Sequence, residues 1–105
     1  MDGQGEEQET ITVRVDGPRL DRELEFYSLS TCAMCRRARE FLDASGFAYT
    51  LTFVDRLGFD EKRLLKERLS ARYGMRVVFP ALAVDGQKIV LGFFREAWEE
   101  VLNHE

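Results

Sequence analysis

The sequence predicts an α/β fold: a mixed four-stranded sheet flanked by three helices, with room for one extra N-terminal strand. Three observations support this prediction. A helical pattern separates two strand-like segments, so these strands must be parallel and joined by a crossover, which we expect to be right-handed. A β-hairpin around Asp85-Gly86 then adds two antiparallel strands. An amphipathic helix follows the hairpin, so helices are available for both faces of the sheet.

Length and composition fit one small domain. The chain has 105 residues, of which 45% are hydrophobic and 32% are charged, an ordinary balance for a globular protein with a single core. Residues 1–9 carry four acidic residues and no apolar residue after Met1. Such a segment buries too little surface to offset its ordering entropy. We therefore predict a disordered acidic tail over 1–9 and a single domain over 10–105.

The first strands are indicated by alternation and by turn residues. Residues 10–15 alternate apolar and polar side chains, the period of a half-buried strand. Residues 16–18, Asp-Gly-Pro, are typical of a turn. Residues 24–29 are predicted to form a second strand, a candidate for the centre of the sheet. Whether residues 10–15 join the sheet stays open at this point.

A helix is predicted directly after the second strand. Ser30 or Thr31 is suited to cap its N-terminus, and Gly46 is suited to end it. Charged residues occupy the other faces of this helix. Its apolar stripe recurs at helical spacing and consists of Cys35, Ala38, Phe41 and Leu42.

The remaining elements follow in order along the chain. Residues 47–54 alternate as a strand, and residues 59–73 form a second predicted helix that ends at Gly74. Residues 81–84 and 88–91 are the strands of the hairpin. The side chains expected to face inward from the second helix are Leu64, Leu65 and Leu69. Those expected from the last helix are Phe94, Ala97, Trp98, Val101 and Leu102.

Cys32 and Cys35 are the only cysteines, and their Cys-x-x-Cys spacing at the start of a predicted helix indicates redox chemistry. Cys32 lies at the helix N-terminus, where the helix dipole and free N–H groups favour a thiolate. Arg36 and Arg37 add positive charge one turn further on. Cys35 lies on the apolar stripe and should be less exposed and less acidic. We therefore expect Cys32 to attack a disulfide and Cys35 to resolve the resulting mixed disulfide.

Three motifs in a fixed order resemble the glutaredoxin family of the thioredoxin-like fold over residues 24–103. They are Phe26-Tyr27-Ser28-x-x-x-Cys32-x-x-Cys35, Pro80 before a hairpin with Asp85-Gly86 at its turn, and Leu91-Gly92-Phe93 before the last helix. The resemblance implies that Pro80 is cis and faces the cysteines, which leaves the backbone at Phe79 free to pair with an extended substrate. The substrate-binding residues expected on this basis are Met34, Phe79, Pro80, Gly92 and Phe93.

The departures from the family pattern concern glutathione. The family's basic residue three positions before the first cysteine is Leu29 here, and its Gly-Gly with paired acids is replaced by the segment 92–96, Gly-Phe-Phe-Arg-Glu. Each lost charged partner is worth roughly 1.5–3 kcal/mol, so two losses weaken binding on the order of a hundredfold. We therefore predict no cofactor and weak glutathione binding. Thioredoxin reductase and glutathione remain the alternatives for the reductant.

Several classes of function are disfavoured. The net charge of −4 leaves no basic excess for nucleic acid. No apolar run approaches the ~20 residues of a membrane span, and the acidic N-terminus lacks the basic region of a signal peptide. Two cysteines are too few for a secreted disulfide scaffold. We expect a cytoplasmic monomer that acts on protein disulfides.

Three functional hypotheses follow, led by a thiol–disulfide oxidoreductase that reduces protein or mixed disulfides. A metal site in one chain is disfavoured because structural zinc takes four ligands and only Cys32, Cys35 and the distant His104 offer suitable donors. The first alternative is a dimeric iron–sulfur cluster module, which combines Cys32 of two chains with glutathione and which Ala33 in place of the family proline leaves open. The second alternative is a thioredoxin-fold interaction domain whose cysteines are incidental.

Overall fold

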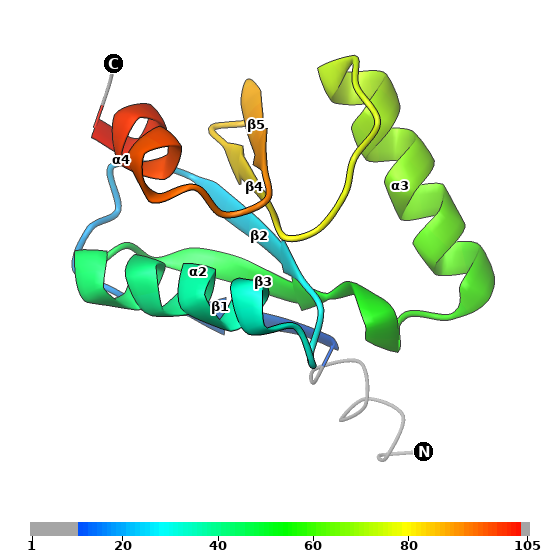
Figure 1. Cartoon of the computed structure of the whole chain (residues 1–105), viewed down its shortest axis with the longest axis horizontal. Helices are drawn as coiled ribbons and strands as arrows, with labels where there is room; N and C mark the ends of the chain where they lie inside the picture. The colour runs from blue at the N-terminus through cyan, green and yellow to red at the C-terminus, as the bar shows by residue number, and fades with distance from the viewer. Residues whose placement is uncertain (1–10, 104–105) are drawn as a thin grey trace.

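A computed structural model of the chain describes residues 11–103, and they form a five-stranded mixed sheet with helices on both faces (Figure 1). The predicted tail over 1–9 and His104 lie outside the described residues. Among residues 11–103, no helix is long and apolar enough to span a bilayer. The strands are β1 (Thr12–Val15), β2 (Leu24–Ser28), β3 (Tyr49–Phe53), β4 (Ala81–Val84) and β5 (Lys88–Leu91). The helices are α2 (Ala33–Ser45), the short 3-10 helix η1 (Val54–Arg56), α3 (Phe59–Tyr73) and α4 (Arg95–Asn103).

The strand order β1-β3-β2-β4-β5 places β2 at the centre of the sheet, as predicted. The strand β2 runs parallel to β3, its neighbour across the α2 crossover, and antiparallel to β4. The N-terminal segment joins the sheet as β1, which pairs antiparallel with β3 through Val13 and Leu51. The sheet therefore has the predicted mixed topology, and the extra strand completes one edge.

Each face of the sheet has its own hydrophobic core. The helices α2 and α4 share the larger core, in which Phe26 makes edge-to-face contacts with Tyr49 and Trp98. The helix α3 covers the other face through Leu65 and Leu69. Figure 1 shows the same division, with α2 and α4 on one side of the sheet and α3 on the other. Both layers that the sequence predicts are present.

Three predicted core residues are instead exposed. Phe94 is 65% exposed because α4 begins at Arg95, so the Phe94 ring precedes the helix and does not join its apolar stripe. Ala97 is also exposed, one position before the buried Trp98. Leu64 is 52% exposed because α3 turns only the face carrying Leu65 toward the sheet. Helical spacing shows that apolar residues lie on one side of a helix, but it does not show which of them face the sheet or where the helix begins. This explains the three wrong core assignments.

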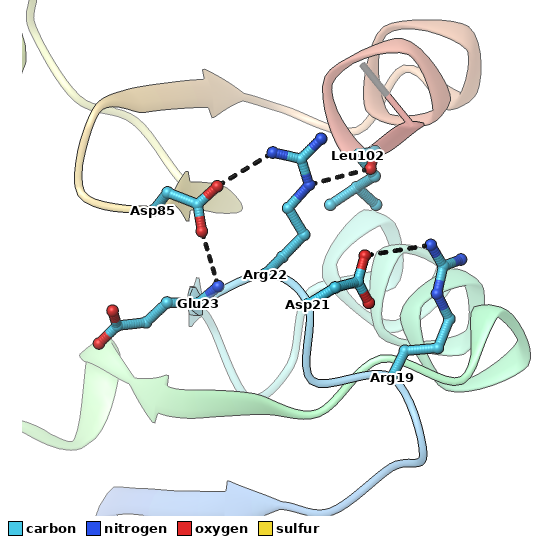
Figure 2. A network of polar contacts seen from close by, with 6 residues as sticks. All are labelled: Arg19, Asp21, Arg22, Glu23, Asp85 and Leu102. Atoms are coloured by element: carbon cyan, nitrogen blue, oxygen red, sulfur yellow. Dashed lines mark hydrogen bonds and ion pairs between the residues drawn. The ribbon is translucent and has the colours of Figure 1, made fainter. Parts of the chain in front are cut away.

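A polar network holds together the end of the sheet where β2 begins (Figure 2). Asp85, in the β4–β5 turn, accepts hydrogen bonds from the backbone N–H of Glu23 at 2.8 Å and from the Arg22 guanidinium at 3.0 Å. The same guanidinium donates to the carbonyl of Leu102 in the last turn of α4, at 3.2 Å. This network links the hairpin, the segment before β2 and α4.

Candidate active site

The cysteine loop, Pro80 and Gly92 lie at one end of the sheet. The strand β2 ends at Ser28 and leads into the loop that carries Cys32. Its residue Tyr27 pairs with Ala81, which in turn pairs with Leu91. Pro80, before Ala81, and Gly92, after Leu91, therefore occupy the edge of the sheet at which β2 ends. Strand pairing thus brings the motif around Pro80 and the motif around Gly92, both distant in sequence, to the same end of the sheet as the cysteine loop.

Cys32 is the N-cap residue of α2. Its backbone is extended, and its Sγ accepts a hydrogen bond from the backbone N–H of Cys35 at 3.2 Å. Its carbonyl accepts the first helical bond, from Arg36 at 3.1 Å. The prediction of Ser30 or Thr31 as the cap was wrong. The Ser30 hydroxyl is bound by Asp55, and the sulfur of Cys32 takes the capping position.

The thiol of Cys32 is partly exposed, and its pKa is lowered from the ordinary value. The largest cause is the hydrogen bond from the Cys35 side chain. The backbone N–H groups of Cys35 and Met34 and the charge of Arg37 add to it, against partial desolvation. Of the two arginines singled out in the sequence, Arg37 contributes to this shift, and both arginines lie on the exposed side of α2.

Cys35 has the opposite environment. Its side chain is only 1% exposed, and burial, followed by the hydrogen bond to Cys32, raises its pKa to about 11. The backbone N–H of Leu29 donates to Cys35 Sγ at 3.4 Å and opposes the rise, as does the hydroxyl of Ser28. Both cysteines are free thiols in this structure. The pair thus holds one acidic, accessible thiol and one buried, weakly acidic thiol.

The bond between Phe79 and Pro80 is cis, as the family resemblance implies. Pro80 is buried, whereas Phe79 is half-buried against the core beneath α3. The carbonyl of Pro80 accepts a hydrogen bond from the backbone N–H of Gly92 at 2.7 Å. The two segments that are expected to bind substrate are therefore joined to each other.

Gly92, Phe93 and Met34 differ in accessibility. Gly92 has a φ of +69°, and its carbonyl accepts a hydrogen bond from the indole N–H of Trp98 at 3.0 Å. The ring of Phe93 packs on Trp98 with a centroid distance of 5.0 Å, and on Phe41 at 5.6 Å, so it belongs largely to the core. Met34 is 38% exposed on the first turn of α2. Of these side chains, Met34 is the most available to a partner.

Asp55, in η1, is the residue at this end of the sheet that sequence reasoning missed. One of its carboxylate oxygens accepts the backbone N–H of Ser30 at 2.9 Å, and the other accepts the Ser30 hydroxyl at 2.5 Å. These hydrogen bonds hold the pKa of Asp55 below its ordinary value. One signal was available: β2 and β3 were predicted to be parallel, and the carboxyl ends of parallel strands meet at one edge. Asp55 and Ser30 each follow such an end.

A groove lies between α2 and α4. Arg37, Phe41 and Phe93 line it, and it encloses about 530 Å³. Arg95 and Glu99 of α4 also line the groove, and they form an ion pair at 3.3 Å. Among residues 11–103, three or more His, Cys, Asp or Glu side chains do not gather into a group that could hold a metal ion.

Comparisons with known proteins agree with this geometry. The family model for glutaredoxins matches residues 24–89. A glutaredoxin structure from Methanosarcina mazei Go1 is 27% identical, covers 89% of this chain and 88% of its own, and has a TM-score of 0.75.

Two further structures from archaea are similar. A glutaredoxin from Archaeoglobus fulgidus is 32% identical, with 78% of this chain and 87% of its own covered and a TM-score of 0.68. Methanoredoxin from Methanosarcina acetivorans is 29% identical, with 78% and 85% covered and the same TM-score of 0.68. No curated protein matches the chain in sequence. The family match over most of the chain, the thioredoxin-like fold and the Cys-x-x-Cys pair together show that this protein belongs to the glutaredoxin family.

Proposed function

We propose that this protein is a thiol–disulfide oxidoreductase that reduces protein or mixed disulfides with Cys32 and Cys35. The thiolate of Cys32 attacks one sulfur of the substrate disulfide, and the other sulfur leaves as a thiolate. Cys35, once deprotonated, attacks Cys32 Sγ and displaces the second substrate sulfur. The substrate gains two electrons and becomes two thiols, while the cysteine pair becomes a disulfide.

One observation carries this proposal: the two thiols are three residues apart and have opposite environments. Cys32 Sγ caps α2 and is partly exposed, with a lowered pKa. Cys35 is buried beneath it, with a pKa raised to about 11. A lowered pKa increases the thiolate fraction available for attack at neutral pH, and partial exposure admits a substrate. These properties assign the attack to Cys32 and the resolution to Cys35.

We place the substrate against Met34, the backbone of Phe79 and the segment from Gly92 to Phe93. The pairing between β2, β4 and β5 supports this placement because it aligns Pro80 and Gly92 with the end of β2. Met34 offers an exposed apolar contact beside Cys32. An extended segment of a protein substrate suits this edge better than a small disulfide does, because backbone pairing requires a peptide.

We further propose that glutathione is the poorer reductant. Leu29 stands where the family has a cation, and its side chain packs against the core beneath α3. The start of α4 carries Arg95 and Glu96, and Arg95 is already paired with Glu99. A glutathione carboxylate therefore meets no cation at position 29, and the γ-glutamyl end of glutathione does not meet the paired acids of the family pattern. A reductase that transfers electrons directly to the Cys32–Cys35 disulfide is the favoured donor.

The test compares two donors and three proteins. Oxidised wild type, Cys32→Ser and Cys35→Ser are supplied with glutathione and glutathione reductase, or with thioredoxin reductase and NADPH, using insulin as the protein disulfide. We expect wild type to be faster with thioredoxin reductase, and both variants to lose that activity. Full glutathione-dependent activity in Cys35→Ser would contradict the dithiol mechanism, because a single thiol would then suffice.

A further inference from the structure

Asp55 fixes the loop between β2 and α2 from outside the loop. Its carboxylate takes both donors of Ser30, the backbone N–H at 2.9 Å and the hydroxyl at 2.5 Å. The two residues are 25 positions apart, and Asp55 belongs to the η1 turn after β3. Because Ser28 also pairs with Phe53 across β2 and β3, this contact extends the pairing of the two strands beyond their ends.

The residue next to this contact points at the buried thiol. The backbone N–H of Leu29 donates to Cys35 Sγ at 3.4 Å. The carbonyl of Leu29 accepts hydrogen bonds from the Ser28 hydroxyl at 3.3 Å and from the N–H of Cys32 at 3.5 Å. Asp55 holds the peptide unit that carries the Leu29 carbonyl and the Ser30 N–H. The Leu29 N–H belongs to the preceding peptide unit, which is joined to the held unit at the Leu29 Cα, so its orientation depends in part on where Ser30 is held.

We propose that Asp55 is a positioning residue for the second step of disulfide exchange: through Ser30, it holds the Leu29 N–H against Cys35 Sγ, where that donor stabilises the resolving thiolate. This inference rests on the proposed dithiol function. It assigns to the resolving cysteine a donor of its own, separate from the helix N-terminus that serves Cys32.

The chemistry of the second step explains why such a donor matters. Cys35 must lose its proton before it attacks Cys32 Sγ, and burial disfavours the negative charge that results. The donors that oppose this effect come from the Leu29 N–H and the Ser28 hydroxyl. A donor that is already oriented avoids reorganisation at the moment of reaction. Releasing Ser30 would let the Leu29 amide turn away, and the thiolate would become rarer.

The experiment separates the two steps with 5,5′-dithiobis(2-nitrobenzoic acid), mixed with reduced protein in a stopped-flow instrument. Attack by Cys32 releases one equivalent of the yellow nitrothiolate, and resolution by Cys35 releases a second. In Asp55→Ala we expect an unchanged first phase and a second phase that is about three- to tenfold slower. A pKa increase of one unit at the attacking thiol slows exchange only about three- to fourfold below that pKa, because the remaining thiolate is more nucleophilic.

Two further variants distinguish positioning from charge and from general stability. Asp55→Asn can still accept the Ser30 N–H and donate to its hydroxyl, so it should recover most of the second-phase rate and its pH profile. Asp21→Ala removes an exposed aspartate that is paired with Arg19 at 3.5 Å, and should match wild type in both phases. If Asp55→Ala does not fold, Ser30→Ala removes one of the two hydrogen bonds and should slow the second phase less.

The outcomes are distinct. A second phase in Asp55→Ala with wild-type rate and pH profile would overturn the positioning role, and so would equal slowing of both phases. Failure of the proposed function itself would already be visible in wild type, which would then release a single equivalent of nitrothiolate with no second phase.

Discussion

At the scale of single residues, position in the helix gives two identical side chains opposite properties. Cys32 precedes the first turn of α2, where its sulfur accepts N–H donors and lies near the charge of Arg37. Cys35, one turn further, points into the core and has one backbone donor, from Leu29. The sulfur of Cys32 is therefore the more readily ionised, and the two thiols stabilise each other's preferred protonation state.

The pKa of Cys32 should respond unequally to its neighbours. Cys35→Ala removes the side-chain hydrogen bond that contributes most to the lowered pKa of Cys32, so this pKa should rise toward its ordinary value of 9.0. Arg37→Gln should raise it by less, because its charge is the last of the contributions, and Arg36→Gln is the control that should leave it unchanged. The rate of iodoacetamide alkylation against pH measures all three variants. A larger effect for Arg36→Gln than for Arg37→Gln would contradict this assignment.

The sequence predicted the asymmetry of the cysteines but not the residues that hold them. Helical spacing was enough to place Cys35 on the apolar stripe and Cys32 before it, because both are local properties. It could not separate Arg36 from Arg37, since adjacent residues differ only in the direction of their side chains. Asp55 lies far from the cysteines in sequence, and its contact with Ser30 depends on how two strands end side by side.

At the scale of elements, the junction between β5 and α4 decides what is exposed at the candidate site. Gly92 is held by two hydrogen bonds, to Pro80 and from Trp98. Its left-handed backbone turns the chain so that Phe93 enters the core and Phe94 does not. The sequence pattern placed Phe94 on the apolar stripe of the last helix, but α4 begins at Arg95, so the Phe94 ring precedes the helix and stays exposed.

Gly92→Ala should destabilise the protein more than Gly74→Ala, although both glycines have nearly the same φ, +69° and +70°. A side chain in this conformation costs about 1–2 kcal/mol by itself. A Cβ at Gly74 would meet no atom within 4 Å, whereas one at Gly92 would lie 3.1 Å from the ring of Phe94. The crowding should add about 1 kcal/mol in the free energy of unfolding, measured with urea.

The double variant Gly92→Ala/Phe94→Ala tests the cause. Without the ring, the destabilisation by Gly92→Ala, measured against Phe94→Ala alone, should fall to the value found for Gly74→Ala. An excess that persists in the double variant would show that the two hydrogen bonds at Gly92, and not the Phe94 ring, prevent the backbone from relaxing.

At the scale of the whole molecule, local periodicity was sufficient to predict the fold class, because each strand and helix is formed by one continuous segment whose own pattern identifies it. The crossover between β2 and β3 followed from element order, the hairpin followed from its turn residues, and the segment 24–29 was the candidate for the central strand. Polar contacts between residues far apart in sequence could not be predicted, because the sequence pattern around an arginine or aspartate does not indicate which residue it contacts. The network of Arg22, Asp85 and Leu102 in Figure 2 is of this kind.

This network should make stability depend on acid pH through Asp85. The N–H of Glu23, and then Arg22, hold the pKa of Asp85 below its ordinary value of 3.8. A carboxyl with a lowered pKa in the folded state stabilises the protein fully above the ordinary value, and the contribution is lost as pH falls through the lowered value. Asp85→Asn keeps a residue that suits the turn, where φ is +56°, but removes the charge that Arg22 pairs with.

We therefore expect Asp85→Asn to lower the free energy of unfolding by about 1 kcal/mol at pH 7, a modest value because the carboxylate is partly exposed. Wild type and variant should converge in acid, as the pH falls through the lowered pKa of Asp85 and the carboxyl becomes protonated in both states. Asp21→Asn, in a more exposed ion pair with Arg19, is the matched control and should change stability little at either pH. Urea unfolding at neutral and at acid pH measures the free energy of unfolding of each protein. A difference for Asp85→Asn that is equally large in acid would mean that it comes from the turn and not from the charge that ties the hairpin to Arg22.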